Sequence, residues 1–281
     1  MTAGTRPRSA SWAEIRPSTS RLPGPNLGEM WQYRDVAYFL ALRDLKLRYK
    51  QTLFGVAWAI IQPVAAAVVF SLIFGSAAGL PSDGLPYPVF VYSGLVVWTY
   101  FSTGLNATAT SLVDHRALVE KLYFPRLLAP FAAALPGLVD FGISLVVLAV
   151  FMVAYGVAPG VEIVLLPVWA VLLFALLLGV GTWLAALNVH YRDIKYGLPF
   201  LIQLWLFTSP VVFPSSIIDG GVRWVYALNP VVGLIDGFRW SVIGAPAPDV
   251  TDLVSLASGL LLLVSGVVYF RRAERRFADV I

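Results

Sequence analysis

Six long stretches of this sequence contain almost no ionisable side chain. Five of them lack Asp, Glu, Lys and Arg altogether, namely 51–82, 84–113, 163–189, 196–218 and 253–270. The sixth stretch, 127–161, contains only Asp140. Because a helix needs about 20 apolar residues to cross the hydrocarbon core, each stretch is long enough for one span. The sequence therefore predicts an all-α integral membrane protein with six transmembrane helices.

Composition agrees with this fold class and excludes several kinds of chemistry. The chain is 58% hydrophobic and 13% charged, whereas about a quarter of a soluble domain is charged. It has no cysteine, which rules out disulfides, thiolate metal sites and a cysteine nucleophile. The two histidines, His115 and His190, are too few and too far apart for a multi-histidine metal site. We expect no metal site and no catalytic residue in this chain.

Nucleotide and diphosphate chemistry is also absent from the sequence. No Gly-Lys dipeptide occurs, and a Walker A loop requires one to hold the phosphates of ATP. No two acidic residues are adjacent, which argues against the paired-aspartate magnesium sites of prenyl-type transferases. The chain therefore has no ATPase site of its own.

Basic residues define the orientation. Every Lys and Arg except Arg223 and Arg239 falls on one side of the six stretches, so the positive-inside rule places both termini in the cytoplasm. The net charge of +4 reflects this topology, and nucleic acid is not an expected partner. Residues 1–28 are rich in Pro, Ser and Arg without an apolar core, which predicts a flexible cytoplasmic tail before a membrane domain over 29–281.

The segment 31–50 has the pattern of an amphipathic helix on the membrane surface. Its apolar face is expected to hold Tyr38, Leu42, Leu45 and Tyr49, beside a stripe of Arg43, Lys46 and Lys50. Such a helix serves either as a membrane anchor or as a docking element for a partner, and the pattern leaves both functions open.

The segment 114–124 is a short cytoplasmic connection with its own helical pattern. Leu118 and Leu122 lie one turn apart among charged residues, and Pro125 disfavours helix at the residue before it. We expect a helix of two or three turns, which is either a simple connection or a small docking surface.

The connection 219–252 lies on the outer side and is unusually apolar for a loop. It contains Trp224, Tyr226, Leu228, Val231, Val232, Leu234, Ile235, Phe238 and Trp240. A solvated loop does not need this much apolar surface, so we expect a re-entrant segment or one that packs over the bundle. Asn229 and Pro230 form a helix-start signal, and Asp236 and Arg239 are spaced for an ion pair. The segment is a structural cover or an outer gate.

Asp140 is the ionisable residue placed deep in a predicted span. A charge at the bilayer centre costs about 2.5–3.5 kcal/mol on insertion scales, so we expect it to face the interior with a partner. It is either a coupling-ion site or a polar contact between helices. The aromatic residues Tyr92, Trp98 and Phe101 pack the bundle or line a path for sugar rings.

Several ordered sequence blocks resemble the permease subunits of ABC-2 type transporters, in the branch that exports lipid-linked polysaccharides such as O-antigen and teichoic acid. The blocks are Arg43–Thr52 with Gly55, Trp58 and Gln62-Pro63, then Glu120–Arg126, Asn188–Ile194, Leu228-Asn229-Pro230, Phe238-Arg239-Trp240 and Phe277–Ile281. They cover the chain from about residue 40 onward. Phe213 departs from the tyrosine expected from the family pattern.

The resemblance implies a homodimer in the bacterial cytoplasmic (inner) membrane, with two copies of a separate cytoplasmic ABC ATPase that bind ATP and Mg. It implies a polyprenyl-linked glycan as substrate, in contact with membrane lipids. It also implies an ATPase-coupling surface formed by Arg43, Lys46, Arg48, His115, Arg116, Glu120, Lys121 and Arg126. The implied outer gate contains Asn229, Pro230, Asp236, Arg239 and Trp240.

Two other functions remain open from the sequence. An ABC-2 type exporter of a lipid or a drug would have the same layout of spans. An ion-coupled secondary transporter would use Asp140 as its coupling site, although no inverted internal repeat is evident.

Overall fold

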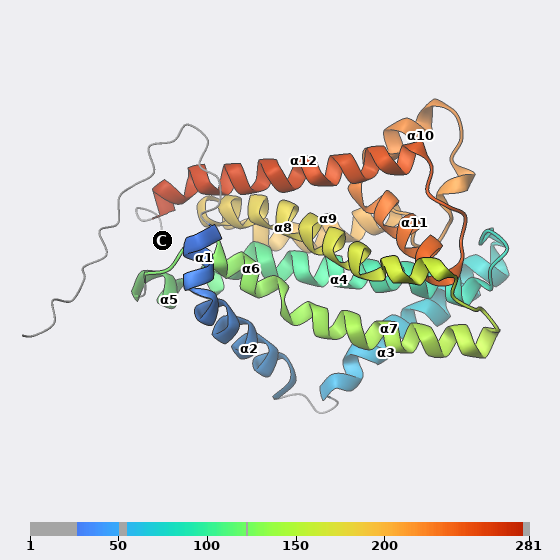
Figure 1. The fold of residues 1–281 in the computed structure, drawn as a ribbon, viewed down its shortest axis with the longest axis horizontal. Coiled ribbons are helices and arrows are strands. Elements are labelled where there is room, and N and C mark those ends of the chain that lie inside the picture. The colour runs from blue at the N-terminus through green and yellow to red at the C-terminus, as the bar shows by residue number, and fades with distance from the viewer. Residues whose placement is uncertain (1–26, 51–54, 122, 278–281) are drawn as a thin grey trace, which may run out of the picture.

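The computed structural model describes residues 27–50, 55–121 and 123–277, and this part of the chain consists of helices and connecting segments without strands. Figure 1 shows an elongated bundle in which the long helices run roughly along its longest axis. They are α4 (Tyr87–Asp114), α7 (Pro136–Tyr155), α8 (Leu166–His190) and α12 (Val250–Ala273). The predicted all-α fold is confirmed for the described residues.

Helix α4 is the central element of the bundle. It is 28 residues long, which corresponds to about 42 Å. It packs against α7, α8 and α11 (Pro230–Ile243), and also against α3 (Trp58–Phe70) and α6 (Leu128–Ala134). Every residue from Val89 to Trp98 is buried. Because neighbouring helices surround α4, it lacks the exposed apolar stripe of an outer helix.

Within the described residues, four helical segments are long and apolar enough to span a membrane. They are Gly55–Ala77, Leu128–Tyr155, Val161–His190 and Val250–Ala273, and they correspond to the predicted stretches 51–82, 127–161, 163–189 and 253–270. At most 28% of each apolar window is buried, so most of their side chains face outward. The first of these segments consists of η1 (Gly55–Ala57), α3 and the π-helical η2 (Ser71–Ala77). The third begins with η3 (Val161–Leu165).

The fifth predicted stretch, 196–218, differs from a continuous span. Its helix α9 (Ile194–Phe207) has 14 residues, or about 21 Å, which is shorter than a hydrocarbon core of about 30 Å. The hydroxyls of Thr208 and Ser209 donate to the Trp205 carbonyl, and Pro210 has no amide to continue the helix. The chain therefore leaves α9 in an irregular turn, and the count of six spans stays a prediction.

One end of the bundle gathers the N-terminal helices and the C-terminal segment (Figure 1). It contains α1 (Leu27–Gln32), α2 (Arg34–Lys50), α5 (Arg116–Lys121) and η5 (Glu274–Arg276). We call it the inner end, because it carries most of the basic residues. The predicted short helix after α4 is present as α5. Residues 1–26 of the predicted flexible tail lie outside the described residues. Helix α1 begins at Leu27, which is within the predicted tail of residues 1–28.

Helix α2 buries a different face from the predicted apolar one. Ala37 and Leu40 are buried in a cluster with Phe124, Leu128 and Phe277, whereas Tyr38 is 62% exposed. The exposed position of Tyr38 is open to a membrane surface, so the predicted contact of this face with lipid stays a prediction. In the structure α2 packs against α6, and this helix contact selects the smaller side chains instead.

The opposite end, which we call the outer end, contains η4 (Ser215–Ile217), α10 (Gly221–Tyr226) and α11 (Figure 1). The predicted start signal is confirmed: Asn229 caps α11 by accepting a 3.1 Å hydrogen bond from the Val231 amide, and Pro230 is its first residue. All but two residues of α11, Asp236 and Trp240, are buried. The outer segment is therefore packed into the bundle. Whether it re-enters the membrane stays a prediction.

Candidate functional site

Two of the predicted coupling residues tie α2 to the inner end of α4. His115, which follows the last residue of α4, is 6% exposed. Its Nε2 atom lies 3.1 Å from Asp44 Oδ2, and Arg43 Nη2 lies 3.1 Å from Asp44 Oδ1. Burial alone would raise the pKa of Asp44, but the hydrogen bonds and charges of His115 and Arg43 outweigh it and hold this pKa below its usual value.

A second contact ties α2 to α7 through Asp140. Arg48 Nη1 lies 2.6 Å from Asp140 Oδ2, and the Tyr49 hydroxyl donates to Asp140 Oδ1. Asp140 is the fifth residue of α7, about 6 Å from the inner start of that helix. The structure thus gives Asp140 the partner that its burial requires, within reach of the interface helix.

A cavity of about 430 Å³ lies between α2 and the bundle, next to the Asp44–His115 and Arg48–Asp140 contacts. Its walls include Leu47 of α2, Gly104 and Ala107 of α4, and Ala133 and Gly137 near the α6–α7 junction. These small side chains leave space between the interface helix and the bundle. The hydrogen bond between Asp44 and His115 and the ion pair between Arg48 and Asp140 therefore join α2 to α4 and α7 beside a poorly filled region.

Arg126 connects the start of α6 to the C-terminal segment. Its backbone amide donates to Glu274 Oε1 at 3.3 Å, and its Nη1 donates to the Glu274 carbonyl at 3.0 Å. Arg271 holds the same carboxylate at 2.9 Å. The Arg126 guanidinium lies 5.9 Å from the ring of Phe277, which is fully buried. Arg126 therefore stabilises the fold of the inner end.

The structure divides the eight predicted coupling residues into two groups. Arg43, Arg48, His115 and Arg126 have the internal partners described above. Lys46, Arg116 and Lys121 are exposed on α2 and α5. The side chain of Glu120 lies outside the described set. The sequence did not single out Asp44 and Glu274, the acceptors that define the internal group, although Asp44 adjoins Arg43 in the block that resembles the family.

At the outer end, Arg239 is 1% exposed and joins three segments. Its Nη1 donates to the Pro210 carbonyl at 2.5 Å, and its Nη2 donates to the Val211 carbonyl at 2.8 Å. On α4, Nη2 also donates to the Phe90 carbonyl at 3.1 Å, and the guanidinium lies 3.6 Å from the Phe90 ring. The predicted contact with Asp236 is present at 3.9 Å. Arg239 is thus an anchor for the turn after α9.

Gly94 on α4 provides the space that Arg239 occupies. A Cβ atom at Gly94 would lie 2.6 Å from Arg239 Nη2 and 3.1 Å from the backbone of Val211. The Ser93 hydroxyl lies 3.3 Å from Arg239 Nε and completes the set of contacts. No sequence pattern marks Gly94, because only the fold brings it next to an arginine far along the chain.

Asn229 joins α9, α11 and α12. Its Oδ1 accepts from Trp205 Nε1 at 2.9 Å, and its Nδ2 donates to the Thr208 carbonyl at 3.0 Å. Its own carbonyl accepts from the Ser255 hydroxyl of α12 at 2.6 Å. The predicted gate residues Asn229 and Arg239 therefore hold the same turn after α9 from two directions. Trp240 packs against the core cluster.

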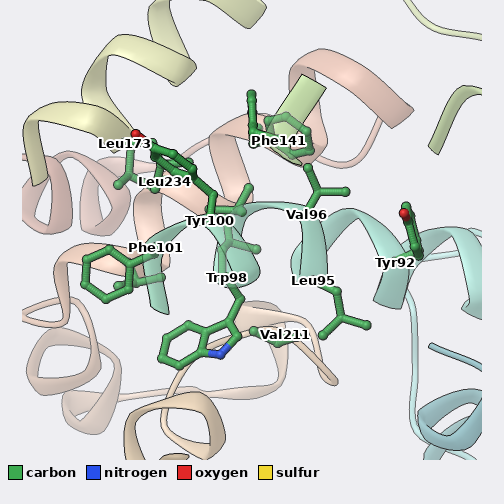
Figure 2. Packing of buried hydrophobic residues seen from close by; sticks show 14 of the residues in the cluster. Tyr92, Leu95, Val96, Trp98, Tyr100, Phe101, Phe141, Leu173, Val211 and Leu234 are labelled. Atoms are coloured by element: carbon green, nitrogen blue, oxygen red, sulfur yellow. The ribbon is translucent and has the colours of Figure 1, made fainter. Parts of the chain in front are cut away.

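The three aromatic residues proposed for a glycan path lie in the packed core. Tyr92, Trp98 and Phe101 are at most 5% exposed. Tyr92 stacks on Phe151 at 4.9 Å, and Phe101 meets Trp205 edge-on at 5.1 Å. Figure 2 shows Trp98 on the same side of α4 as Val211. In this conformation the three side chains pack helices together, which is one of the two alternatives that the sequence left open, and their role in a glycan path stays a prediction.

Residues 36–243 match the family described as ABC-2 type transporter. An O-antigen export system permease protein RfbA of Myxococcus xanthus is 32% identical over 90% of this chain and 98% of its own length. A protein of the same name from Klebsiella pneumoniae is 24% identical over 91% of this chain and 97% of its own length. A polysialic acid transport protein KpsM of Escherichia coli is 24% identical over 84% of this chain and 92% of its own length. The chain therefore belongs to the ABC-2 type transporter family.

Proposed function

We propose that this chain is the permease subunit of an ATP-driven exporter that moves a lipid-linked polysaccharide across the cytoplasmic membrane. The observation that carries the proposal is the nearly full-length similarity to a protein named as an O-antigen export permease. The polysialic acid transport protein supports the same class of substrate, because its name also refers to a long glycan. The polyprenyl carrier is part of the proposal.

The motor of the exporter is a separate cytoplasmic ABC ATPase, present in two copies with a homodimer of this chain. The sequence has no Gly-Lys dipeptide for a Walker A loop, so ATP and Mg bind to the partner subunit. Lys46, Arg116 and Lys121 are the exposed predicted coupling residues, and they form the ATPase-contacting surface.

Movement of α2 reaches the membrane spans through its two ionic contacts. Asp44 connects it to His115 at the inner end of α4, and Arg48 connects it to Asp140 in α7. Helix α4 then continues to Phe90 and Gly94, where Arg239 anchors the outer turn. One helix of about 42 Å thus connects the motor side of the permease with its outer gate.

In the membrane, α4 and α9 complete the set of six spans with the four long apolar segments. Both termini lie in the cytoplasm of a bacterial cell, and the segment 219–252 re-enters the outer leaflet as a gate. The ion-coupled alternative loses support, because Asp140 is engaged by Arg48 and Tyr49.

Deletion of the gene in its native host tests this function. We expect loss of a surface polysaccharide and accumulation of the polyprenyl-linked glycan on the cytoplasmic side, both reversed by a plasmid copy. An unchanged cell surface together with altered efflux of a small drug or a lipid would support the other branch of the superfamily.

A further inference from the structure

Two carboxyl groups lie on neighbouring helices at the outer end, and the proposed function assigns no role to them as a pair. Asp236 lies in the middle of α11, and Asp252 lies in the first turn of α12. The Asp236 side chain is 14% exposed, and Asp252 is 4% exposed. Helix α11 packs closely on α12 at this point, since a Cβ atom at Gly233, about one turn before Asp236, would lie 2.5 Å from the Asp252 carbonyl oxygen, and the two carboxyl groups interact. The contact therefore joins α11, the helix of the predicted outer gate, to the start of α12.

Each carboxyl group keeps one buried oxygen without a donor. Among the described residues, Asp236 Oδ2 and Asp252 Oδ1 have no hydrogen-bond partner. Their other oxygens are engaged: Asp252 Oδ2 accepts from the Asp249 amide at 2.8 Å, and Asp236 Oδ1 lies 3.9 Å from Arg239 Nη1. Ionised carboxylates only accept hydrogen bonds, so two of them in contact leave both oxygens unsatisfied and repel each other.

The surrounding groups do not remove this repulsion. Arg239 distributes its donors over backbone carbonyls, and Arg223 of α10 is held by Asp249 at 2.5 Å. Two further acidic groups, Asp83 and Asp249, add negative charge, and the Tyr226 hydroxyl is buried beside Asp236 without a partner. The Ser215 hydroxyl is a donor that reaches Asp236.

We propose that Asp236 and Asp252 share one proton, and that this O–H···O⁻ bond holds α11 against the start of α12. A shared proton turns two unsatisfied acceptors into one donor and one acceptor, and it removes one of the two negative charges. Release of the proton at alkaline pH on the outer side restores the repulsion, which loosens the gate helix. A metal ion fits less well, because the described residues contain no group of three acidic or histidine ligands.

The absence of native cysteine allows a direct test in the full chain. Val232 lies one turn before Asp236 on α11 and is 3% exposed, whereas Val222 on α10 is 68% exposed. We would introduce Val232→Cys or Val222→Cys and measure alkylation by a membrane-impermeant maleimide in membranes, from about pH 5 to about pH 8. We would divide the alkylation rate of the Val232→Cys chain by the rate of the Val222→Cys chain, because this ratio removes the effect of thiol ionisation that both positions share.

With both aspartates present, this ratio is expected to rise with pH by up to about tenfold per pH unit, as the release of one proton requires. Asp236→Asn and Asp252→Asn keep a donor in the contact at every pH, so each is expected to give a low ratio that does not change with pH. Asp83→Asn is the matched control, because Asp83 is a nearby exposed carboxylate that accepts from Ser216. It should leave the pH dependence in place.

A flat ratio in the parent chain would overturn the proposal, and so would an unchanged slope in both Asn variants. Closure of α11 at alkaline pH by added Mg²⁺ or Ca²⁺ would also overturn it, since the pair would then bind a cation. The measurement on the chain with both aspartates tests the proposal even if the Asn variants do not fold. It also needs no glycan or ATPase, so its result is independent of the proposed transport function.

Discussion

The Arg48 guanidinium lies 2.6 Å from the Asp140 carboxylate, which links helix α2 to α7, part of a segment that is long and apolar enough to span a membrane. This contact changes the interpretation of Asp140. A lone intramembrane carboxylate suggests an ion pathway, whereas a carboxylate paired with a residue of the interface helix is a mechanical connection. The same helix is tied to α4 through Asp44 and His115.

The Arg48–Asp140 contact predicts a measurable coupling energy. Asp140→Ala and Arg48→Ala are each expected to lower thermal stability in detergent, and the double variant should lose less than the sum. Because the Arg48 side chain is 42% exposed, we expect a coupling of about 1 kcal/mol. The charge-reversed pair Arg48→Asp with Asp140→Arg should recover part of the loss, whereas strictly additive effects would show that the contact contributes nothing.

Gly94 should tolerate no side chain. A methyl group there meets Arg239 Nη2 and the Val211 backbone, so Gly94→Ala is expected to destabilise the fold by about 1–3 kcal/mol and to reduce export. Gly142→Ala is the matched control, because a Cβ atom at Gly142 in α7 meets nothing within 4 Å. Equal melting temperatures for the two variants would contradict the close packing at Arg239.

Arg239 should not be replaceable by lysine. Its guanidinium donates in several directions at once to Pro210, Val211 and Phe90, and an ammonium group on a flexible stem does not reproduce this geometry. We expect Arg239→Lys to destabilise the protein by about 2 kcal/mol, since buried carbonyls lose donors. Arg223→Lys, at the exposed contact with Asp249, serves as the comparison and should cost less than about 1 kcal/mol.

The exposed inner-end cations should affect coupling without affecting stability. Lys46→Ala, Arg116→Ala and Lys121→Ala are expected to reduce export and ATPase association, and for Lys46→Ala and Lys121→Ala the melting temperature should stay the same. Lys50→Ala provides a control on the same face of the membrane, because Lys50 is exposed on α2 but is not a predicted coupling residue. Unchanged export in all three variants would remove this surface from the coupling proposal.

Asp44 should make the attachment of α2 sensitive to acid. Its pKa is lowered in the folded protein, so its contribution is fully present above the ordinary carboxyl pKa of about 4 and is lost as the pH falls through the lowered value. We expect thermal stability to fall below about pH 4. Asp44→Asn should reduce the size of this fall, and an identical pH profile in the variant would assign the effect to other carboxylates.

Sequence reasoning located the elements that depend on local chemistry. Stretches without charge predicted the four long apolar segments, and the Asn229-Pro230 signal predicted the start of α11. It also identified Asp140 as a residue that needs a partner. These features depend on composition and short-range hydrogen bonding, which a single sequence contains.

Features that depend on tertiary contacts could not be predicted from the sequence. The sequence could not show that Arg126 pairs with Glu274, or which rings Tyr92 and Phe101 meet inside the bundle. It also predicted one span over 196–218, whereas the structure ends α9 before Pro210 in a turn held by Arg239. In each case the deciding partner lies far away along the chain.

Purification of the tagged chain from its native host in a mild detergent tests the central claim most directly. The account predicts a stoichiometric partner that contains a Walker A motif, equal copies of the two subunits in a complex with a permease dimer, and ATP hydrolysis by that complex. If the chain stays free of any ATPase after cross-linking in intact membranes, and export continues when cellular ATP hydrolysis at such a partner is blocked, the claim of a motor-driven permease is contradicted.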